Sequence, residues 1–177
     1  MTIYFLRHAD AGTPQVDSAS DEKRPLDEQG IKQSHDVGRA LAALKVEPDA
    51  IITSPLVRAR QTAELVAEEL GHKEKLIVDD ALRPEASYGT FQDTLHQYTR
   101  EKAIMVVGHN PSLTEFLNRL LAAGSSFNAI ELKKGAVAKV DFDSQNAGVL
   151  KWCMTPKVIR AIQSASAKSS RPKTVSK

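Results

Sequence analysis

The sequence predicts an α/β domain built as a three-layer sandwich, with a mostly parallel central sheet, helices on both faces and a C-terminal edge hairpin. Short apolar runs alternate with longer amphipathic segments, which is the pattern of repeated strand–helix units. The last two runs instead alternate apolar and polar residues around a polar turn, which is typical of an antiparallel hairpin. A chain of 177 residues is long enough to bury a sizeable core in one domain.

The strands are predicted from the short apolar runs. Ile3–Leu6 is too brief for a helix of ordinary length, and polar residues follow it at once, which predicts a buried strand. The run that ends at Val107 is the most apolar of these segments. The turn of the terminal hairpin contains Asn146 and Gly148. The expected strands are 3–6, 50–53, 75–79, 103–107, 136–142 and 149–154.

The helices are predicted from capping residues and apolar stripes. Asp27 is suited to cap the first helix, and apolar residues recur on one face after it. Ser54-Pro55 starts the second helix, and Gly71 ends it as a C-terminal cap. The polar stretch 9–25 predicts a loop over the end of the first strand. The expected helices are 28–45, 55–70, 90–100 and 111–123.

Charge is distributed unevenly along the chain. Of 24 Lys and Arg, six lie from Lys157 to Lys177, where there is no acidic residue; the rest of the chain has 18 basic and 22 acidic side chains, a net charge of −4. A nucleic-acid-binding domain needs a basic face on its folded part, so we expect no nucleic-acid partner. We expect one domain over residues 1–163 and a basic, disordered tail over 164–177 that is rich in Ser, Ala and Lys.

Composition also indicates the cellular compartment in which the protein is expected. No apolar run approaches the roughly 20 residues of a membrane span, and the chain starts on a predicted strand rather than on a signal sequence. The single cysteine, Cys153, excludes an internal disulfide and a cysteine-rich metal site. We therefore expect a cytoplasmic protein with no membrane partner.

Polar side chains follow three of the expected strands. Arg7 and His8 end the first strand, Arg58 comes shortly after the second, and His109 follows the fourth. Because the ends of parallel strands meet at one edge of a sheet, we expect these four side chains to share one crevice. Arg58 also lies near the start of its helix, where the helix dipole opposes a cation. The cluster therefore predicts a bound phosphate or a similar anion.

Other interpretations of these residues are weaker. His8 taken alone would be read as a structural histidine, but its position beside Arg7 and the matching His109 favour a functional role. No Cys or acidic residue stands at ligand spacing beside the two histidines, so we expect neither a metal nor a cofactor. The motifs of a P-loop and of a serine nucleophile elbow are absent from the sequence. Ser54 precedes a proline, which favours a capping role over a nucleophilic one.

Three motifs together resemble the histidine phosphatase superfamily, whose hallmark is Arg-His-Gly; here Ala9 replaces the glycine. The short length, Arg24-Pro25-Leu26 and the final hairpin near Gly135 are similar to the SixA-type phosphohistidine phosphatase branch. The likeness extends over about residues 2–156 and implies a phosphoglycerate-mutase-like fold. The motifs are Leu6-Arg7-His8-Ala9, Ser54-Pro55-Leu56-Val57-Arg58-Ala59-Arg60-Gln61-Thr62-Ala63 and Val107-Gly108-His109-Asn110-Pro111.

The resemblance implies a role for each residue of the cluster. His8 would attack phosphorus and carry the phosphoryl group, while Arg7, Arg58 and His109 would hold its equatorial oxygens. Arg24 matches an arginine of the SixA-type branch and would add a phosphate or substrate contact. Water would then hydrolyse phospho-His8 without a metal.

The general acid is the one catalytic role to which the three motifs assign no residue. Larger members of the superfamily use a carboxylate from an insertion or from the loop after the third strand, where Glu85 is the candidate here, with Asp10 and Asp93 as weaker ones. SixA-type enzymes resemble this chain in lacking a clear acid. An imidazole leaving group can depart after protonation by solvent, whereas an alkoxide needs a placed proton donor.

We expect a monomeric phosphatase that removes phosphate from phosphohistidine on a signalling protein, its partner. A small-molecule phosphomonoesterase or mutase-like enzyme is the alternative, although a mutase needs an enclosed pocket and no segment is left over to close one. A silent phosphate-binding module is the third possibility, because a fold does not guarantee activity. It would predict loss of the nucleophile or of a phosphate-binding residue, and all four are present.

Overall fold

The computed structural model describes residues 1–14, 16–122, 130–142 and 148–169. Its six-stranded sheet has the order β3-β2-β4-β1-β5-β6. The pairs β2–β3, β2–β4 and β1–β4 are parallel, and β1–β5 and β5–β6 are antiparallel. The predicted parallel sheet with an edge hairpin is therefore confirmed. The strands are β1 (Thr2–Arg7), β2 (Ala50–Thr53), β3 (Ile77–Val78), β4 (Ala103–Gly108), β5 (Val137–Phe142) and β6 (Gly148–Met154).

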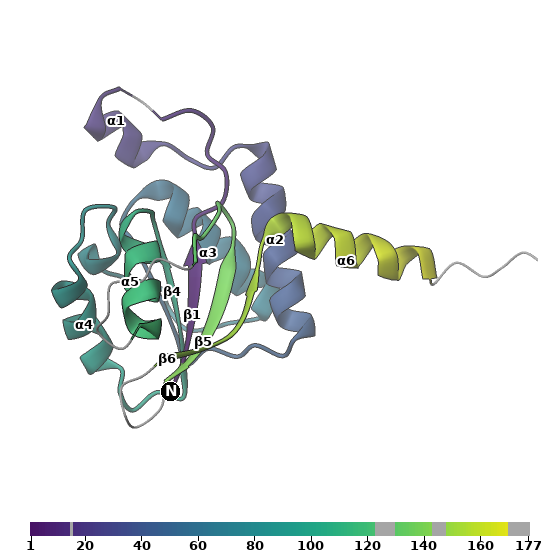
Figure 1. Cartoon of the computed structure of the whole chain (residues 1–177). Helices are drawn as coiled ribbons and strands as arrows, with labels where there is room; N and C mark the ends of the chain where they lie inside the picture. The colour runs from purple at the N-terminus through teal and green to yellow at the C-terminus, as the bar shows by residue number, and fades with distance from the viewer. Residues whose placement is uncertain (15, 123–129, 143–147, 170–177) are drawn as a thin grey trace, which may run out of the picture.

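Helices cover both faces of the sheet, as predicted. Figure 1 shows α4 and α5 on one side and α2, α3 and α6 on the other. Alternate residues of β1 point to the two sides: Phe5 packs with Phe91 and Phe116, whereas Leu6 packs with Val37 and other apolar residues of α2 and α3. The helices are α1 (Ser18–Lys23), α2 (Glu28–Ala43), α3 (Val57–Leu70), α4 (Tyr88–Gln97), α5 (Ser112–Leu121) and α6 (Pro156–Ser169), with a 3₁₀ turn at Asp80–Leu82.

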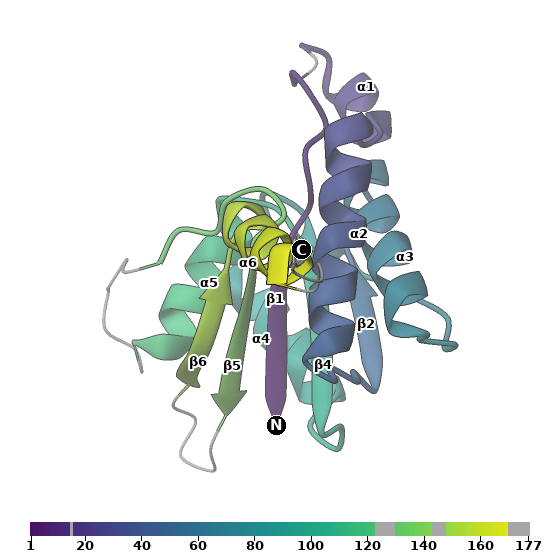
Figure 2. The ribbon, with the colours of Figure 1, turned by 90° about the vertical axis from the view of Figure 1, so that its right-hand side faces the viewer.

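Helix α1 lies within the segment expected to be a loop. Its six residues, SASDEK, show no apolar stripe, so periodicity could not reveal it. The Asp17 carboxylate caps it by accepting the Ser20 N–H at 2.9 Å. Both Figure 1 and Figure 2 show α1 beyond the carboxyl end of β1, which places it beside the predicted crevice.

Helix α6 extends into the segment that composition predicts to be a disordered tail. Disorder is predicted from residue 164, but the helix continues to Ser169; residues 170–177 lie outside the described part. Pro156 stands at its first position, which favours a helix start, and Ile159 is buried against α2 and α3. Ala and Lys, which made the segment look disordered by composition, are also good helix formers.

Several other elements differ from the prediction at their ends, β3 and α3 among them. Strand β3 has two residues instead of the expected five. Helix α3 begins at Val57, two residues after the predicted first position Pro55. Ser54 thus lies outside the helix, and its side chain becomes part of the cluster described next. None of the helices in the described part of the chain has the length and apolar content of a transmembrane span.

Candidate active site

The structure brings the two sequence-predicted histidines together. Strands β1 and β4 are parallel neighbours in which Arg7 is opposite Gly108, so the residues that follow each strand emerge side by side. The His8 N–H donates to the Gly108 carbonyl at 3.0 Å. The His8 and His109 rings lie with their centroids 4.9 Å apart, and both side chains are buried.

His8 is held in a form suited to nucleophilic attack. Its Nδ1 lies 2.7 Å from the Ala9 carbonyl oxygen. A carbonyl can only accept, so Nδ1 carries the proton and Nε2 carries a lone pair. Burial, together with the charges of Arg58, Arg7 and Lys134 and against the hydrogen bond to Ala9, lowers the pKa of His8 to about 3. The imidazole is therefore neutral at physiological pH.

Helix α3 fixes the peptide that orients His8. The Ala9 N–H donates to Thr62 Oγ1 at 3.1 Å, and the Thr62 hydroxyl donates to the Arg58 carbonyl at 2.7 Å. The residue after His8 and Arg58 are thus both tied to helix α3. Thr62 was not singled out in the sequence, although it belongs to the second motif.

His109 is neutral for a similar reason. Burial, together with the neighbouring His8, Arg58 and Arg7, lowers its pKa to about 2. Its Nε2 lies 2.9 Å from the Ser54 hydroxyl oxygen. The capping role expected of Ser54 is found only in part: its oxygen accepts the Leu56 N–H at 3.3 Å, while its hydroxyl faces His109.

Arg7 ends β1 directly before His8, and Arg58 lies in the first turn of α3. Arg7 Nη1 donates to the Leu132 carbonyl at 2.8 Å, and Arg58 Nη1 donates to the Asp21 carbonyl at 2.7 Å. The charges of both guanidinium groups lower the pKa of both histidines, so the four side chains form one electrostatic cluster. Each arginine is thus anchored through one nitrogen and leaves others for a ligand.

Three buried nitrogen atoms of this cluster have no hydrogen-bond partner among the described residues: Arg7 Nε, Arg58 Nε and His109 Nδ1. A buried donor without a partner costs about 1–3 kcal/mol, and more when it is charged. A tetrahedral oxyanion offers several acceptor oxygens and a charge that matches the two arginines. The site is therefore shaped for phosphate or a group like it.

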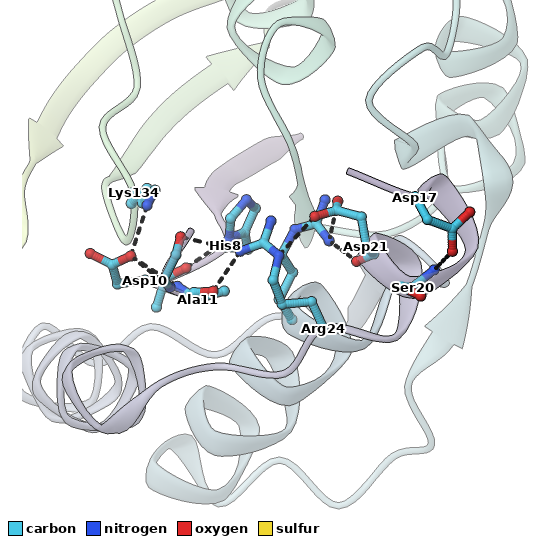
Figure 3. Close-up of polar contacts among 11 residues, drawn as sticks. His8, Asp10, Ala11, Asp17, Ser20, Asp21, Arg24 and Lys134 are labelled. Atoms are coloured by element: carbon cyan, nitrogen blue, oxygen red, sulfur yellow. Dashed lines mark hydrogen bonds and ion pairs between the residues drawn. The ribbon is translucent and has the colours of Figure 1, made fainter. Parts of the chain in front are cut away.

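Arg24 and Asp21 form an ion pair at the end of helix α1, next to Arg58. Arg24 Nε donates to Asp21 Oδ1 at 2.8 Å, and its Nη1 donates to the Ala11 carbonyl at 2.6 Å. Asp21 Oδ2 lies 3.2 Å from Arg58 Nη1. Figure 3 shows Asp21 on one side of His8 and the Asp10–Lys134 ion pair on the other. Asp21 was missed in the sequence because α1 was not predicted.

The three candidate acids are not among the buried side chains. Glu85 is exposed and lines a hollow of about 280 Å³ together with Asp21, Leu56, Arg58 and other residues of α1 and of the loop after β3. Asp10 pairs with Lys134 at 2.7 Å, which lowers the pKa of the carboxyl, so Asp10 is an unsuitable proton donor. Asp93 is exposed on α4. No group of three His, Cys, Asp or Glu that could hold a metal ion occurs among the residues described.

A family model described as the histidine phosphatase superfamily, branch 1, matches residues 3–102. The chain belongs to this superfamily. The match includes Arg7, His8, Arg24, Arg58 and Glu85, while His109 follows it.

This histidine phosphatase is similar to other proteins along most of its length. It is 31% identical to the phosphohistidine phosphatase SixA of Escherichia coli over 88% of this chain and 94% of that protein. An uncharacterised protein of Picosynechococcus is 36% identical over 77% of this chain and 82% of its own. The solved structure of SixA complexed with tungstate superposes with a TM-score of 0.79 at 28% identity, covering 89% of this chain and 98% of that one. These similarities identify the chain as a phosphatase.

The fold is shared more widely. A mycobacterial glucosyl-3-phosphoglycerate phosphatase in complex with VO₃ has a TM-score of 0.67 at 14% identity, over 85% of this chain and 97% of its own. At that identity the likeness shows the phosphoglycerate-mutase-like fold alone. The shared fold therefore does not identify the substrate.

The buried histidines predict a specific dependence of stability on pH. His8 has its ordinary pKa near 6.5 in the unfolded chain and a pKa of about 3 in the folded one. Between these values the unfolded state binds more protons, so the free energy of unfolding falls as the pH drops below 6.5, by up to about 1.4 kcal/mol per unit for each such histidine. Urea denaturation from pH 7 to 4.5 should therefore show a shallower dependence for His8→Gln than for the wild type.

The control is His96→Gln, because His96 is exposed on α4. His96→Gln should keep the wild-type dependence of unfolding free energy on pH. The carboxylates are common to all three proteins, so their contribution cancels in the comparison. Equal slopes for His8→Gln and the wild type would contradict a buried neutral His8.

Proposed function

We propose that this phosphatase removes the phosphoryl group from phosphohistidine on a protein through a covalent phospho-His8 intermediate. The observation that carries the proposal is a set of three buried nitrogen atoms without a hydrogen-bond partner, Arg7 Nε, Arg58 Nε and His109 Nδ1, in residues that pack against the His8 ring or act on its charge. A neutral nucleophile and a preorganised oxyanion site are the two requirements of phosphoryl transfer to an enzyme side chain.

In the first step, His8 Nε2 forms a bond to phosphorus while the bond between phosphorus and the leaving imidazole breaks. Arg7, Arg58 and His109 hold the three equatorial oxygens, where charge develops in the transition state. The Nδ1–H bond to Ala9 stabilises the positive charge that His8 gains on attack. The leaving imidazole takes up a proton from solvent.

In the second step, water attacks phospho-His8, the Nε2–P bond breaks, and inorganic phosphate leaves with His8 again neutral. Each step breaks one bond to phosphorus and forms one, so no redox partner is involved. Neither step uses a metal ion. Turnover is accordingly expected to be unchanged by EDTA.

Two features support phosphohistidine over an alkyl phosphate. The similarity to SixA, a phosphohistidine phosphatase, extends over nearly the whole of both chains. An imidazole leaving group needs no placed acid, and the candidate Glu85 is exposed in the lining of the hollow rather than buried with the histidines. We further propose a signalling protein as the partner, a monomeric enzyme and a cytoplasmic location.

A small-molecule phosphomonoesterase is the second candidate, and the hollow beside Arg58 is the observation that favours it. Glu85 in its wall could protonate an alkoxide. Arg24 would then contact the substrate through its remaining nitrogen, since its Nε and Nη1 already bind Asp21 and Ala11.

Competing substrates test the proposal. We expect kcat/KM for a protein or peptide carrying phosphohistidine to exceed that for sugar phosphates and phosphoserine by at least about 100-fold, and Glu85→Gln to lower only hydrolysis of the esters. EDTA should change neither. Preference for sugar phosphates, with no release from phosphohistidine, would contradict the proposed substrate.

A further inference from the structure

The hydrogen bond between Ser54 and His109 has a consequence for the chemistry of the site. Ser54 is fully buried at the end of β2, and its hydroxyl oxygen lies 2.9 Å from His109 Nε2. Neutral imidazole carries one proton, either on Nε2 or on Nδ1, and only the protonated nitrogen can donate. The neighbour of Nε2 therefore decides whether Nδ1 is a donor or an acceptor.

The contacts of Ser54 indicate which nitrogen is protonated. Its oxygen already accepts the Leu56 N–H at 3.3 Å. The hydroxyl hydrogen still needs an acceptor, and in the described part of the chain His109 Nε2 is the one within hydrogen-bond distance of Oγ. If Nε2 carried the proton, Ser54 would have two donors facing it and no acceptor for its own hydrogen, which is costly in a fully buried position.

We propose that Ser54 is a positioning residue that donates to His109 Nε2 and so fixes the proton of His109 on Nδ1, the nitrogen that faces the oxyanion site. This inference rests on the proposed function and adds to it the residue that turns His109 into a donor.

The tautomer matters because of the charges that meet at the site. With the lone pair on Nδ1, His109 would present an acceptor to phosphate oxygens, which are themselves acceptors, and would repel them. With the proton on Nδ1 it donates a neutral hydrogen bond without adding a third cation beside Arg7 and Arg58. The unpartnered buried Nδ1 is then the third donor of the site.

The direct test is the ¹⁵N spectrum of the histidine rings in the wild-type protein, with His109 assigned by comparison with His109→Gln. We expect pyrrole-type nitrogen at Nδ1 and pyridine-type nitrogen at Nε2, and a shift of the Nδ1–H proton when inorganic phosphate is added. Pyrrole-type nitrogen at Nε2 would overturn the proposal. This measurement needs no turnover, so it is independent of whether phosphohistidine is the substrate.

Variants of Ser54 provide a second test of its role. Ser54→Ala should allow the proton onto Nε2 and lower kcat/KM about tenfold, while Ser54→Thr, which keeps the hydroxyl, should restore both the tautomer and most of the rate. The matched control is Thr53→Val, because Thr53 is equally buried but its hydroxyl donates only to the Ser54 carbonyl at 3.3 Å in the described structure. An unchanged tautomer and rate in folded Ser54→Ala would also overturn the proposal.

Discussion

His8→Ala is expected to lower turnover by at least about 10⁴-fold while leaving the binding of inorganic phosphate within about tenfold of the wild type. The substitution removes the group that forms the covalent intermediate in the proposed mechanism. The oxyanion donors of Arg7, Arg58 and His109 remain, and they supply the affinity. Single-turnover kinetics and phosphate titration by calorimetry measure the two effects separately.

The comparison variant is His96→Ala, which removes an exposed histidine from α4 and should leave both quantities unchanged. Substantial turnover by folded His8→Ala would mean that water attacks the substrate directly. Loss of phosphate binding together with turnover would instead indicate that His8 is mainly a structural member of the cluster.

Arg58→Ala is expected to weaken phosphate binding at least about 100-fold and to lower kcat/KM by about 10³-fold. Arg58 is buried, and its Nε is one of the three donors left for the oxyanion. Its removal also leaves the Asp21 carboxylate, 3.2 Å from Arg58 Nη1 in the intact protein, beside the phosphate site without this cation. Repulsion of the ligand then adds to the loss of the hydrogen bond.

A second substitution separates these two contributions. Adding Asp21→Asn to Arg58→Ala should recover about tenfold in phosphate affinity, because it removes the repulsive charge. The matched control is Arg60→Ala, two residues farther along α3, where the side chain is half exposed and pairs weakly with Glu64 at 3.9 Å. An effect of Arg58→Ala no larger than that of Arg60→Ala would contradict the assignment of Arg58 to the phosphate site.

The sequence was sufficient for the parts of the fold that depend on apolar pattern. The buried strands and the order of strands and helices follow from where apolar runs stop, and the position of His8 and His109 at neighbouring strand ends follows from the parallel sheet. Arg58 could be added because a cation near a helix start is unfavourable without a partner.

The parts that depend on local polar contacts could not be predicted. Helix α1 has five polar residues and one alanine and is held by a cap and by ion pairs, so nothing in its periodicity separates it from a loop. Asp21, which it presents to Arg58 and Arg24, was missed for that reason. Ser54 and Thr62 were visible in the second motif, but only the folded chain shows that their hydroxyls reach His109 and the Ala9 peptide.

Trapping the covalent intermediate tests the central claim most directly. The enzyme should be mixed with a ³²P-labelled phosphohistidine protein, quenched within milliseconds at alkaline pH, where phosphohistidine survives, and digested for mapping by mass spectrometry. The account predicts a phosphoryl group on His8 Nε2 that forms and decays at rates consistent with turnover and is absent from His8→Ala. Turnover without label on His8, or label on a different residue, would contradict it.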